Sequence, residues 1–130
     1  LLRFSPKLKE QFKAPRKIYA IDNGIVTTRS FATSPNLGKL CENLVFLELV
    51  RRGYKPNQNL FYYQTKNGKE VDFVLRKDYK IEKLIQVCYD LSDLQTKKRE
   101  ESALLEAERE LNCHNSQLIT YDSLESWLLG

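Results

Sequence analysis

Three consecutive segments with strand-like composition, enclosed by two segments with helical spacing, constrain the fold of this chain more than any other feature. Leu60–Thr65, Glu70–Arg76 and Lys83–Leu91 are rich in the β-branched and aromatic residues that favour strands. Along Glu70–Arg76 the apolar residues occupy alternate positions, as expected for a strand that packs one face on a core. Asn67–Gly68, between the first two segments, is typical of a hairpin turn. The sequence therefore predicts a sheet of consecutive strands.

Helical spacing is found on both sides of these strands. Apolar residues from Leu37 to about Arg52 recur on one helical face, and Gly53 follows where helices commonly end. The second helix is predicted to open at Ser92, with Gln95 completing a capping box, and to run to about Leu111. Its other face is dense in Glu and Lys/Arg and is expected to meet solvent.

Shorter elements complete the pattern. Lys17–Asp22 is a strand candidate that leads into the turn residues Asn23–Gly24, and residues 27–36 are interpreted as a polar loop. Gln117–Asp122 is predicted as a final short strand, and residues 124–130 as the start of another helix. The order of helix, three strands, helix and strand predicts an α/β domain with a small mixed sheet flanked by helices.

A length of 130 residues is that of one domain. Residues 1–16 are basic and contain Pro6 and Pro15, so we interpret them as a connector from a preceding domain, with the folded domain at residues 17–130. The sequence begins without Met and is not shaped like a signal peptide, which indicates a piece of a longer protein.

Cysteine usage and hydropathy exclude several classes of protein. Cys41, Cys88 and Cys113 are odd in number and far apart, which argues against a disulfide framework and against a zinc site. A reducing cytoplasm fits these cysteines best. The chain has no apolar run near the roughly 18 residues that span a membrane. We therefore expect a cytoplasmic protein.

Charge is unevenly distributed along the chain. Residues 1–39 carry a net +6 and residues 40–80 a net +3, whereas residues 81–130 carry −5. A basic first half is compatible with a phosphate backbone or an acidic partner, and equally with a solvated surface that contacts nothing. Tyr54, Tyr62 and Tyr63, near Lys55, have the same two interpretations: they stack on nucleic-acid bases, or they pack in the core.

Acidic and amide side chains on the predicted elements suggest one site. Asp72 and Gln86 lie on consecutive strands, and if those strands pair, the two side chains meet at the sheet surface. Glu42 or Glu48 of the first helix would approach the same point. Carboxylate and amide oxygens suit Mg²⁺, which activates water for phosphodiester hydrolysis. Each of these residues also has a structural interpretation, as a satisfied core amide or an ion-pair partner.

The pattern resembles the PD-(D/E)XK, or restriction-endonuclease-like, fold, in which an acid on a first helix precedes a strand Asp and then (Glu/Gln)-x-Lys. The run of segments looks like the C-terminal domain of prokaryotic, including archaeal, AAA-type ATP-binding proteins. The matching segments cover nearly the whole chain: Lys17–Gly24, Leu40–Tyr54, Gly68–Leu75, Leu84–Asp93, Thr96–Glu100 and Leu118–Thr120. The resemblance implies Mg²⁺ or Mn²⁺ as cofactor and DNA as partner. This chain has no P-loop, so ATP would bind only in a missing N-terminal part.

Carried over by position, the resemblance makes Glu42 the helix acid, Asp72 the central aspartate and Gln86 the Glu/Gln residue. Cys88 stands where lysine is expected, and a thiol supplies neither the charge nor the donors of an ammonium. Lys69 and Lys83 fall on the opposite strand faces by alternation, so neither is a convincing replacement. The sequence therefore predicts a degenerate site.

Three functions follow as hypotheses. The first is an accessory, nuclease-derived domain of an AAA-type ATPase that docks nucleic acid or a protein partner, or contacts its own ATPase domain. The second is an active Mg²⁺- or Mn²⁺-dependent DNA nuclease that uses Glu42, Asp72 and Gln86. The third is a structural domain that mediates oligomerisation and binds neither metal nor nucleic acid.

Overall fold

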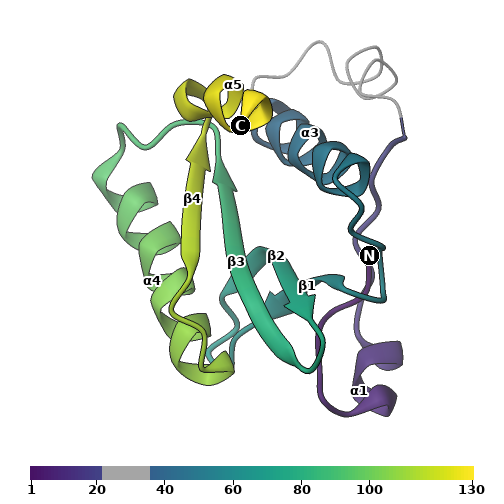
Figure 1. Cartoon of the computed structure of the whole chain (residues 1–130). Helices are drawn as coiled ribbons and strands as arrows, with labels where there is room; N and C mark the ends of the chain where they lie inside the picture. The colour runs from purple at the N-terminus through teal and green to yellow at the C-terminus, as the bar shows by residue number, and fades with distance from the viewer. Residues whose placement is uncertain (22–35) are drawn as a thin grey trace.

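Strands of one mixed sheet form the centre of the computed structural model, which describes residues 1–21 and 36–130 (Figure 1). The strand order is β1 (Leu60–Gln64), β2 (Glu70–Lys77), β3 (Lys80–Cys88) and β4 (Ser116–Thr120). Neighbouring strands are antiparallel from β1 to β3, and β4 runs parallel to β3. This parallel step needs a crossover, which a helix between β3 and β4 supplies. The expected α/β class and mixed sheet are confirmed.

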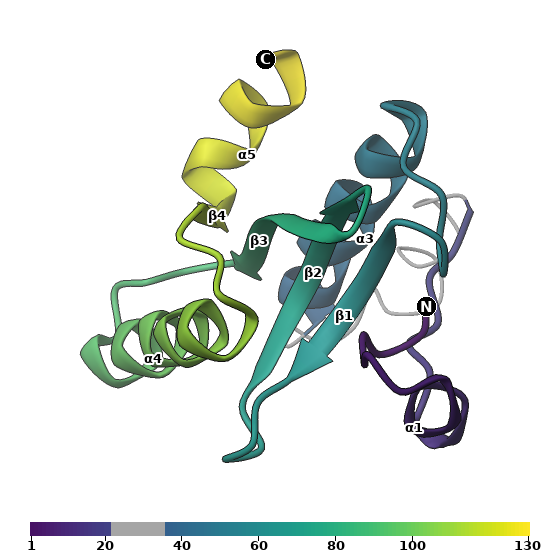
Figure 2. The ribbon, with the colours of Figure 1, turned by 60° about the horizontal axis from the view of Figure 1, so that its bottom comes forward.

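Helices cover both faces of the sheet. The described helices are α1 (Leu8–Lys13), α3 (Asn36–Arg51), α4 (Leu94–Leu111) and α5 (Tyr121–Leu129). Figures 1 and 2 show α3 and α5 on one face of the sheet and α4 on the other. None of the helices in the described part of the chain is long and apolar enough to cross a membrane.

Two apolar clusters form the core, one on each face of the sheet, and this explains why the middle of β2 is buried throughout. The cluster beneath α3 and α5 contains Cys41, Val45, Leu49, Leu60, Phe73, Leu75, Ile85, Val87, Ile119 and Leu124. The cluster beneath α4 contains Leu2, Phe61, Val71, Val74, Leu84, Ala103, Leu104, Ala107 and Cys113. Truncating a fully buried side chain such as Phe73 to alanine would cost about 3–5 kcal/mol.

Local signals fix the ends of the helices. Gly53 follows α3 with a φ of 103°, a conformation that favours glycine, and its N–H donates to Val50 O at 3.0 Å. The predicted cap at Ser92 is wrong by one residue, because Asp93 is the N-cap of α4 and accepts a hydrogen bond from Gln95 N–H. Ser92 instead hydrogen-bonds the carboxylate of Asp90.

Other boundaries differ from the sequence prediction by a few residues. The strand predicted from Lys83 begins at Lys80 and ends at Cys88, and α5 begins at Tyr121, three residues before the predicted start. The strand prediction for Lys17–Asp22 is wrong in its described part, since residues 17–20 have no regular secondary structure. The turn predicted at residues 23–24 lies outside the described residues, and so does the polar loop predicted at residues 27–36, except for Asn36, which begins α3.

The N-terminal segment, interpreted from the sequence as a connector, packs on the domain. Phe4 N–H donates to Tyr62 O at 2.7 Å, and Tyr62 N–H donates to Leu2 O at 3.1 Å, so the segment lies beside β1. Leu2 is buried in the core. Lys17 N–H donates to Leu1 O at 2.9 Å, and this bond fixes the backbone where the chain passes the candidate site.

A carboxylate–lysine cluster as the candidate functional site

The centre of the site is the point where β2 and β3 diverge. Their backbone pairing ends at Phe73 and Ile85. Beyond that pair, Asp72 N–H donates to Gln86 Oε1 at 2.8 Å, and Val87 N–H donates to Asp72 Oδ2 at 2.8 Å. Side-chain oxygens therefore replace the missing backbone acceptors, because buried N–H groups are costly to leave unpaired. The predicted meeting of Asp72 and Gln86 is present. Both side chains hold β2 and β3 together at the point where they diverge, which we call the fork.

A lysine that the sequence prediction did not assign to the site lies among its carboxylates. Lys17 Nζ is 2.7 Å from Glu70 Oε1, 3.1 Å from Asp72 Oδ1 and 3.2 Å from Glu42 Oε2. The lysine side chain is 18% exposed and that of Asp72 is 11% exposed, so these charges interact with little screening by water. We call Lys17, Glu42, Glu70 and Asp72 the carboxylate–lysine cluster.

Helix α3 holds the lysine-bearing segment in place through two side chains. Asn43 Oδ1 accepts from Ala20 N–H at 2.9 Å, and Asn43 Nδ2 donates to Ala20 O at 3.1 Å. Tyr19 OH donates to Glu42 Oε2 at 2.5 Å, and the tyrosine ring stacks on Phe46 with 4.3 Å between ring centroids. The segment that carries Lys17 is therefore clipped to the helix that carries Glu42.

Charge in the cluster is unbalanced, and the pKa directions follow from that. Burial raises the pKa of Asp72 well above its usual value, and nearby Glu42 raises it further while Lys17 opposes both. Burial lowers the pKa of Lys17, but Asp72, Glu42 and Glu70 together outweigh burial and raise it overall. Burial and then Glu42 raise the pKa of Tyr19, so its hydroxyl stays a donor. One ammonium serves three carboxylates, so a proton on Asp72 is released less readily than from an isolated aspartic acid.

Gln86 has all of its amide groups engaged. Its Nε2 donates to Glu70 O at 2.9 Å and to Glu100 Oε2 at 2.5 Å, while its Oε1 accepts from the backbone of Asp72. The side chain is buried, and these three hydrogen bonds satisfy its polar atoms, as burial of an amide requires. The geometry matches the structural interpretation of Gln86 that the sequence left open.

The four residues assigned by resemblance line one pocket of about 540 Å³, namely Glu42, Asp72, Gln86 and Cys88. Cys88 is partly exposed there, its Sγ–H donates to Asp90 O at 3.3 Å, and burial raises the pKa of its thiol. A thiol with a raised pKa is a poor nucleophile at neutral pH. Cys88 therefore adds no charge to the pocket.

The structure distinguishes between the acids and lysines that the sequence offered. Glu48, the other helix acid considered, does not reach the pocket and instead binds Arg51 at 2.5 Å and Arg52 at 3.0 Å. Lys69 lines the pocket, but its Nζ is 2.5 Å from Glu106 Oε2, so its charge is already paired. Glu42 is thus the helix acid of the site, and Lys17 is its cation.

Sequence reasoning missed Lys17 and Tyr19, although a signal was present. The two residues are two positions apart, so in an extended segment both side chains point to the same side. A cluster of acids around the buried Asp72 also requires a counter-charge, and Cys88 at the expected lysine position leaves that charge to be supplied elsewhere. The missing counter-charge was therefore to be sought among the basic residues outside the predicted strands of the site.

The observed donor set does not fit a divalent metal ion. Gln86 Oε1 and Asp72 Oδ2 accept backbone N–H groups, and two further oxygens, Asp72 Oδ1 and Glu42 Oε2, face Lys17 Nζ. Among the described residues there is no group of three or more His, Cys, Asp or Glu arranged to hold a metal. Mg²⁺ or Mn²⁺ would need the lysine to move and further oxygens to converge.

Comparisons with known proteins give a family and relatives without assigned functions. The profile of a family described as a domain of unknown function, DUF4143, matches residues 37–126. Uncharacterized protein MJ1544 of Methanocaldococcus jannaschii is 45% identical over 108 residues, which are 82% of this chain and 23% of that protein. An uncharacterized protein of Haemophilus influenzae is 31% identical over 85 residues, 65% of this chain and 20% of that protein. The chain thus spans a quarter or less of these curated relatives. No solved structure matches it.

Proposed function

This chain belongs to the DUF4143 family, a family of unknown function, and from that premise we propose that it is a nuclease-derived domain that has no metal-dependent chemistry and docks nucleic acid. The observation that carries this proposal is the position of Lys17, whose ammonium contacts the carboxylates of Glu42, Glu70 and Asp72. An internal cation at that point offsets part of the charge that a metal ion would otherwise neutralise, and it lies where the ion would bind.

Two features support descent from a PD-(D/E)XK nuclease. The described elements include helix α3, strands β1 to β3, helix α4 and strand β4 in the order that the resemblance implies. Glu42, Asp72 and Gln86, assigned by that resemblance, line the same pocket at the point where β2 and β3 diverge. Because sites are more informative than folds, the second feature is the stronger one.

The parent protein is proposed to be an AAA-type ATPase. The resemblance supplies this part of the proposal, and the lengths of the relatives are compatible with it, because the matched region is about a fifth to a quarter of each protein. The domain would then act as an accessory that brings a partner to the ATPase. Nucleic acid is the favoured partner because residues 1–80 carry a net +9.

The test uses labelled DNA, as a single strand and as a duplex, with Mn²⁺ or Mg²⁺ present. The proposal predicts binding that weakens steeply with added salt, because phosphate contacts release counterions, and no cleavage by the wild-type chain above that of Asp72→Asn. Cleavage that requires Asp72 would instead establish the nuclease alternative. A stable oligomer that binds no DNA would establish the structural alternative.

A further inference from the structure

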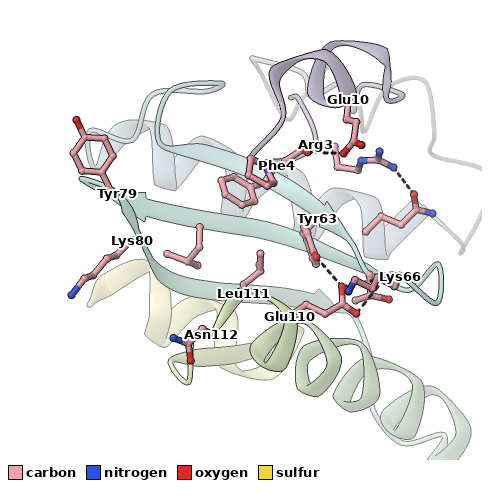
Figure 3. A pocket seen from close by; sticks show the side chains of 15 residues that line it. Arg3, Phe4, Glu10, Tyr63, Lys66, Tyr79, Lys80, Glu110, Leu111 and Asn112 are labelled. Carbon is pink, nitrogen blue, oxygen red and sulfur yellow. Dashed lines mark hydrogen bonds between the residues drawn. The ribbon is translucent and has the colours of Figure 1, made fainter.

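A second cavity, of about 890 Å³, lies on the α4 side of the sheet, between α1 and α4 (Figure 3). In Figure 3 the strands form its floor, with Tyr79 and Lys80 at one end, Lys66 at the other, and Phe4 and Tyr63 between them. We call this cavity the aromatic groove. The β1–β2 hairpin separates it from the carboxylate–lysine cluster, because Lys66 borders the groove and Lys69 borders the other pocket.

Basic side chains in the aromatic groove have unused charge. Lys66 and Lys80 form no ion pair with any described residue, and Arg3 uses one donor, Nη1, on Gln64 Oε1 at 2.8 Å. The two acids that line the groove are already engaged. Glu110 accepts from Tyr63 OH at 2.8 Å and from Lys66 N–H at 3.1 Å, and Glu10 accepts from Ser5 OH at 3.1 Å and lies 3.7 Å from Lys7 Nζ. The groove is therefore suited to an anionic ligand with several charges.

Aromatic rings are presented between these cations. Tyr79 is fully exposed, directly after Asp78, whose φ of 57° turns the chain there. Phe4 is only partly buried and packs edge-on against Phe61, with 5.6 Å between ring centroids. The hydrogen bond to Glu110 holds Tyr63 in one orientation. Tyr79 contributes nothing to the core and presents a free ring beside Lys80 in the same cavity as Phe4 and Tyr63, so a ligand with flat apolar faces can stack there.

We propose that the aromatic groove binds single-stranded nucleic acid, with phosphates at Arg3, Lys66 and Lys80 and bases stacked on Tyr79 and Phe4. This inference rests on the proposed function and gives it a location and a substrate class. Stacking requires unpaired bases, whose faces a duplex hides. An acidic peptide would satisfy the cations but would make no use of the alternation between charged and aromatic side chains.

The experiment measures fluorescence anisotropy of a labelled oligothymidylate of about 15 nucleotides, a length that spans one binding site of this kind. The variants are Tyr79→Ala and the double variant Lys66→Gln with Lys80→Gln, all at surface positions. Tyr79→Ala is expected to weaken binding at least about fivefold, through loss of one stacked base. The double variant is expected to weaken binding and to reduce the slope of log affinity against log salt by about 1.4, the value for two phosphate contacts.

Matched controls lie outside the aromatic groove. Tyr121→Ala removes another exposed tyrosine and Lys97→Gln another exposed lysine, and both are expected to leave the affinity unchanged. If the groove variants bind DNA as tightly as the wild type does, the aromatic groove is not the binding site, and the proposal of nucleic-acid docking still stands. No wild-type binding to any DNA would overturn both proposals. Tighter binding of a duplex of the same length would overturn the single-strand assignment.

Discussion

Two buried acids, Glu48 and Asp72, are treated in opposite ways by this fold. Glu48, near the end of α3, is held by two guanidinium groups, Arg51 and Arg52, with hydrogen bonds of 2.5 to 3.0 Å. Those groups lower its pKa to about 2. Asp72 shares a single ammonium with two other carboxylates, and its pKa is raised.

The difference teaches how the neighbours of a buried acid decide whether its charged form is stabilised. A carboxylate with excess cations is stabilised in its charged form, as expected for a structural ion pair. A buried carboxylate with excess neighbouring acids is a cost to stability, and such arrangements concentrate at functional sites. In this protein Lys17 offsets part of that cost from within the chain.

The largest expected effect comes from removing the internal cation. Lys17→Met should lower the free energy of unfolding by about 3–5 kcal/mol at pH 7, because it leaves three neighbouring carboxylates without a counter-charge. The pKa of Lys17 is raised, so its stabilisation is fully present below 10.5 and is lost only as pH rises beyond that value. Urea unfolding checks this prediction, with Lys97→Met as the matched surface control.

Lys17→Met should lose less of its free energy of unfolding, relative to wild type, in mild acid. At pH 5 the uncompensated carboxylates of Lys17→Met take up protons, so the loss of stability should be smaller than at pH 7. An equal loss at both pH values would mean that the loss does not come from uncompensated carboxylate charge. Such a result would contradict the contrast in charge between the surroundings of Glu48 and those of Asp72.

A smaller effect distinguishes the hydrogen bond that Asp72 accepts from Val87 N–H from the charge that Asp72 carries. Asp72→Ala leaves Val87 N–H without its acceptor, whereas Asp72→Asn retains a side-chain oxygen at that place. The alanine variant should therefore be less stable than the asparagine variant by about 1–3 kcal/mol. Hydrogen exchange at the Val87 amide should accelerate in the alanine variant alone. Equal stabilities would show that the fork does not depend on this bond.

The pH dependence of two charge-removing variants sharpens the comparison. The folded pKa of Glu48 is depressed, so its stabilisation is present above 4.5 and is lost as pH falls toward about 2. Glu48→Gln should cost about 1 kcal/mol at pH 7, and the difference from wild type should vanish over that acid range. A difference that persists at pH 2 would contradict the assignment.

The contribution of Asp72 to stability should depend on pH with the opposite sign. Because its folded pKa is raised, its contribution favours folding at low pH and is lost as pH rises above 3.8 through the folded value. Relative to wild type, Asp72→Asn should therefore gain stability as pH rises through that range. Chemical unfolding of both variants across pH 2 to 7 measures the two trends in one experiment.

The smallest expected effect concerns the residue at the expected lysine position. Cys88→Lys should change stability by no more than about 0.5 kcal/mol, because the side chain is partly exposed at the pocket. It should confer no DNA cleavage in the presence of Mn²⁺, since Lys17 still faces the carboxylates. Cleavage by this variant would show that the site lacks only its lysine.

Much of the fold could be predicted from periodicity and turn chemistry. Strands β1 and β2 and the helix ending at Gly53 follow signals that act within a few residues, and such signals are read directly from the sequence. The start of α4 was misplaced because Ser92 and Asp93 are both good caps, and only the hydrogen bond from Gln95 decides between them. The start of β3 was misplaced because three of its first four residues are charged and directly follow the turn.

The site was predictable only where it lies on regular elements. Glu42, Asp72 and Gln86 could be placed by helix and strand geometry, and they do line one pocket. Lys17 was harder to place, because it is 55 residues from Asp72 and lies in a segment without helix or strand, and its signals were its spacing from Tyr19 and the missing counter-charge. The choice between a ligand and a structural amide at Gln86 also required the hydrogen bonds that form where β2 and β3 diverge.

The central claim, that Lys17 takes the place of a metal ion, is tested most directly by calorimetric titration of Mn²⁺ into the wild-type chain. The account predicts no saturable binding at millimolar Mn²⁺ to the folded protein, with Asp72→Asn giving the same trace. Saturable binding to wild type that is absent in Asp72→Asn would contradict it, because the carboxylates would then prefer the metal ion to the lysine.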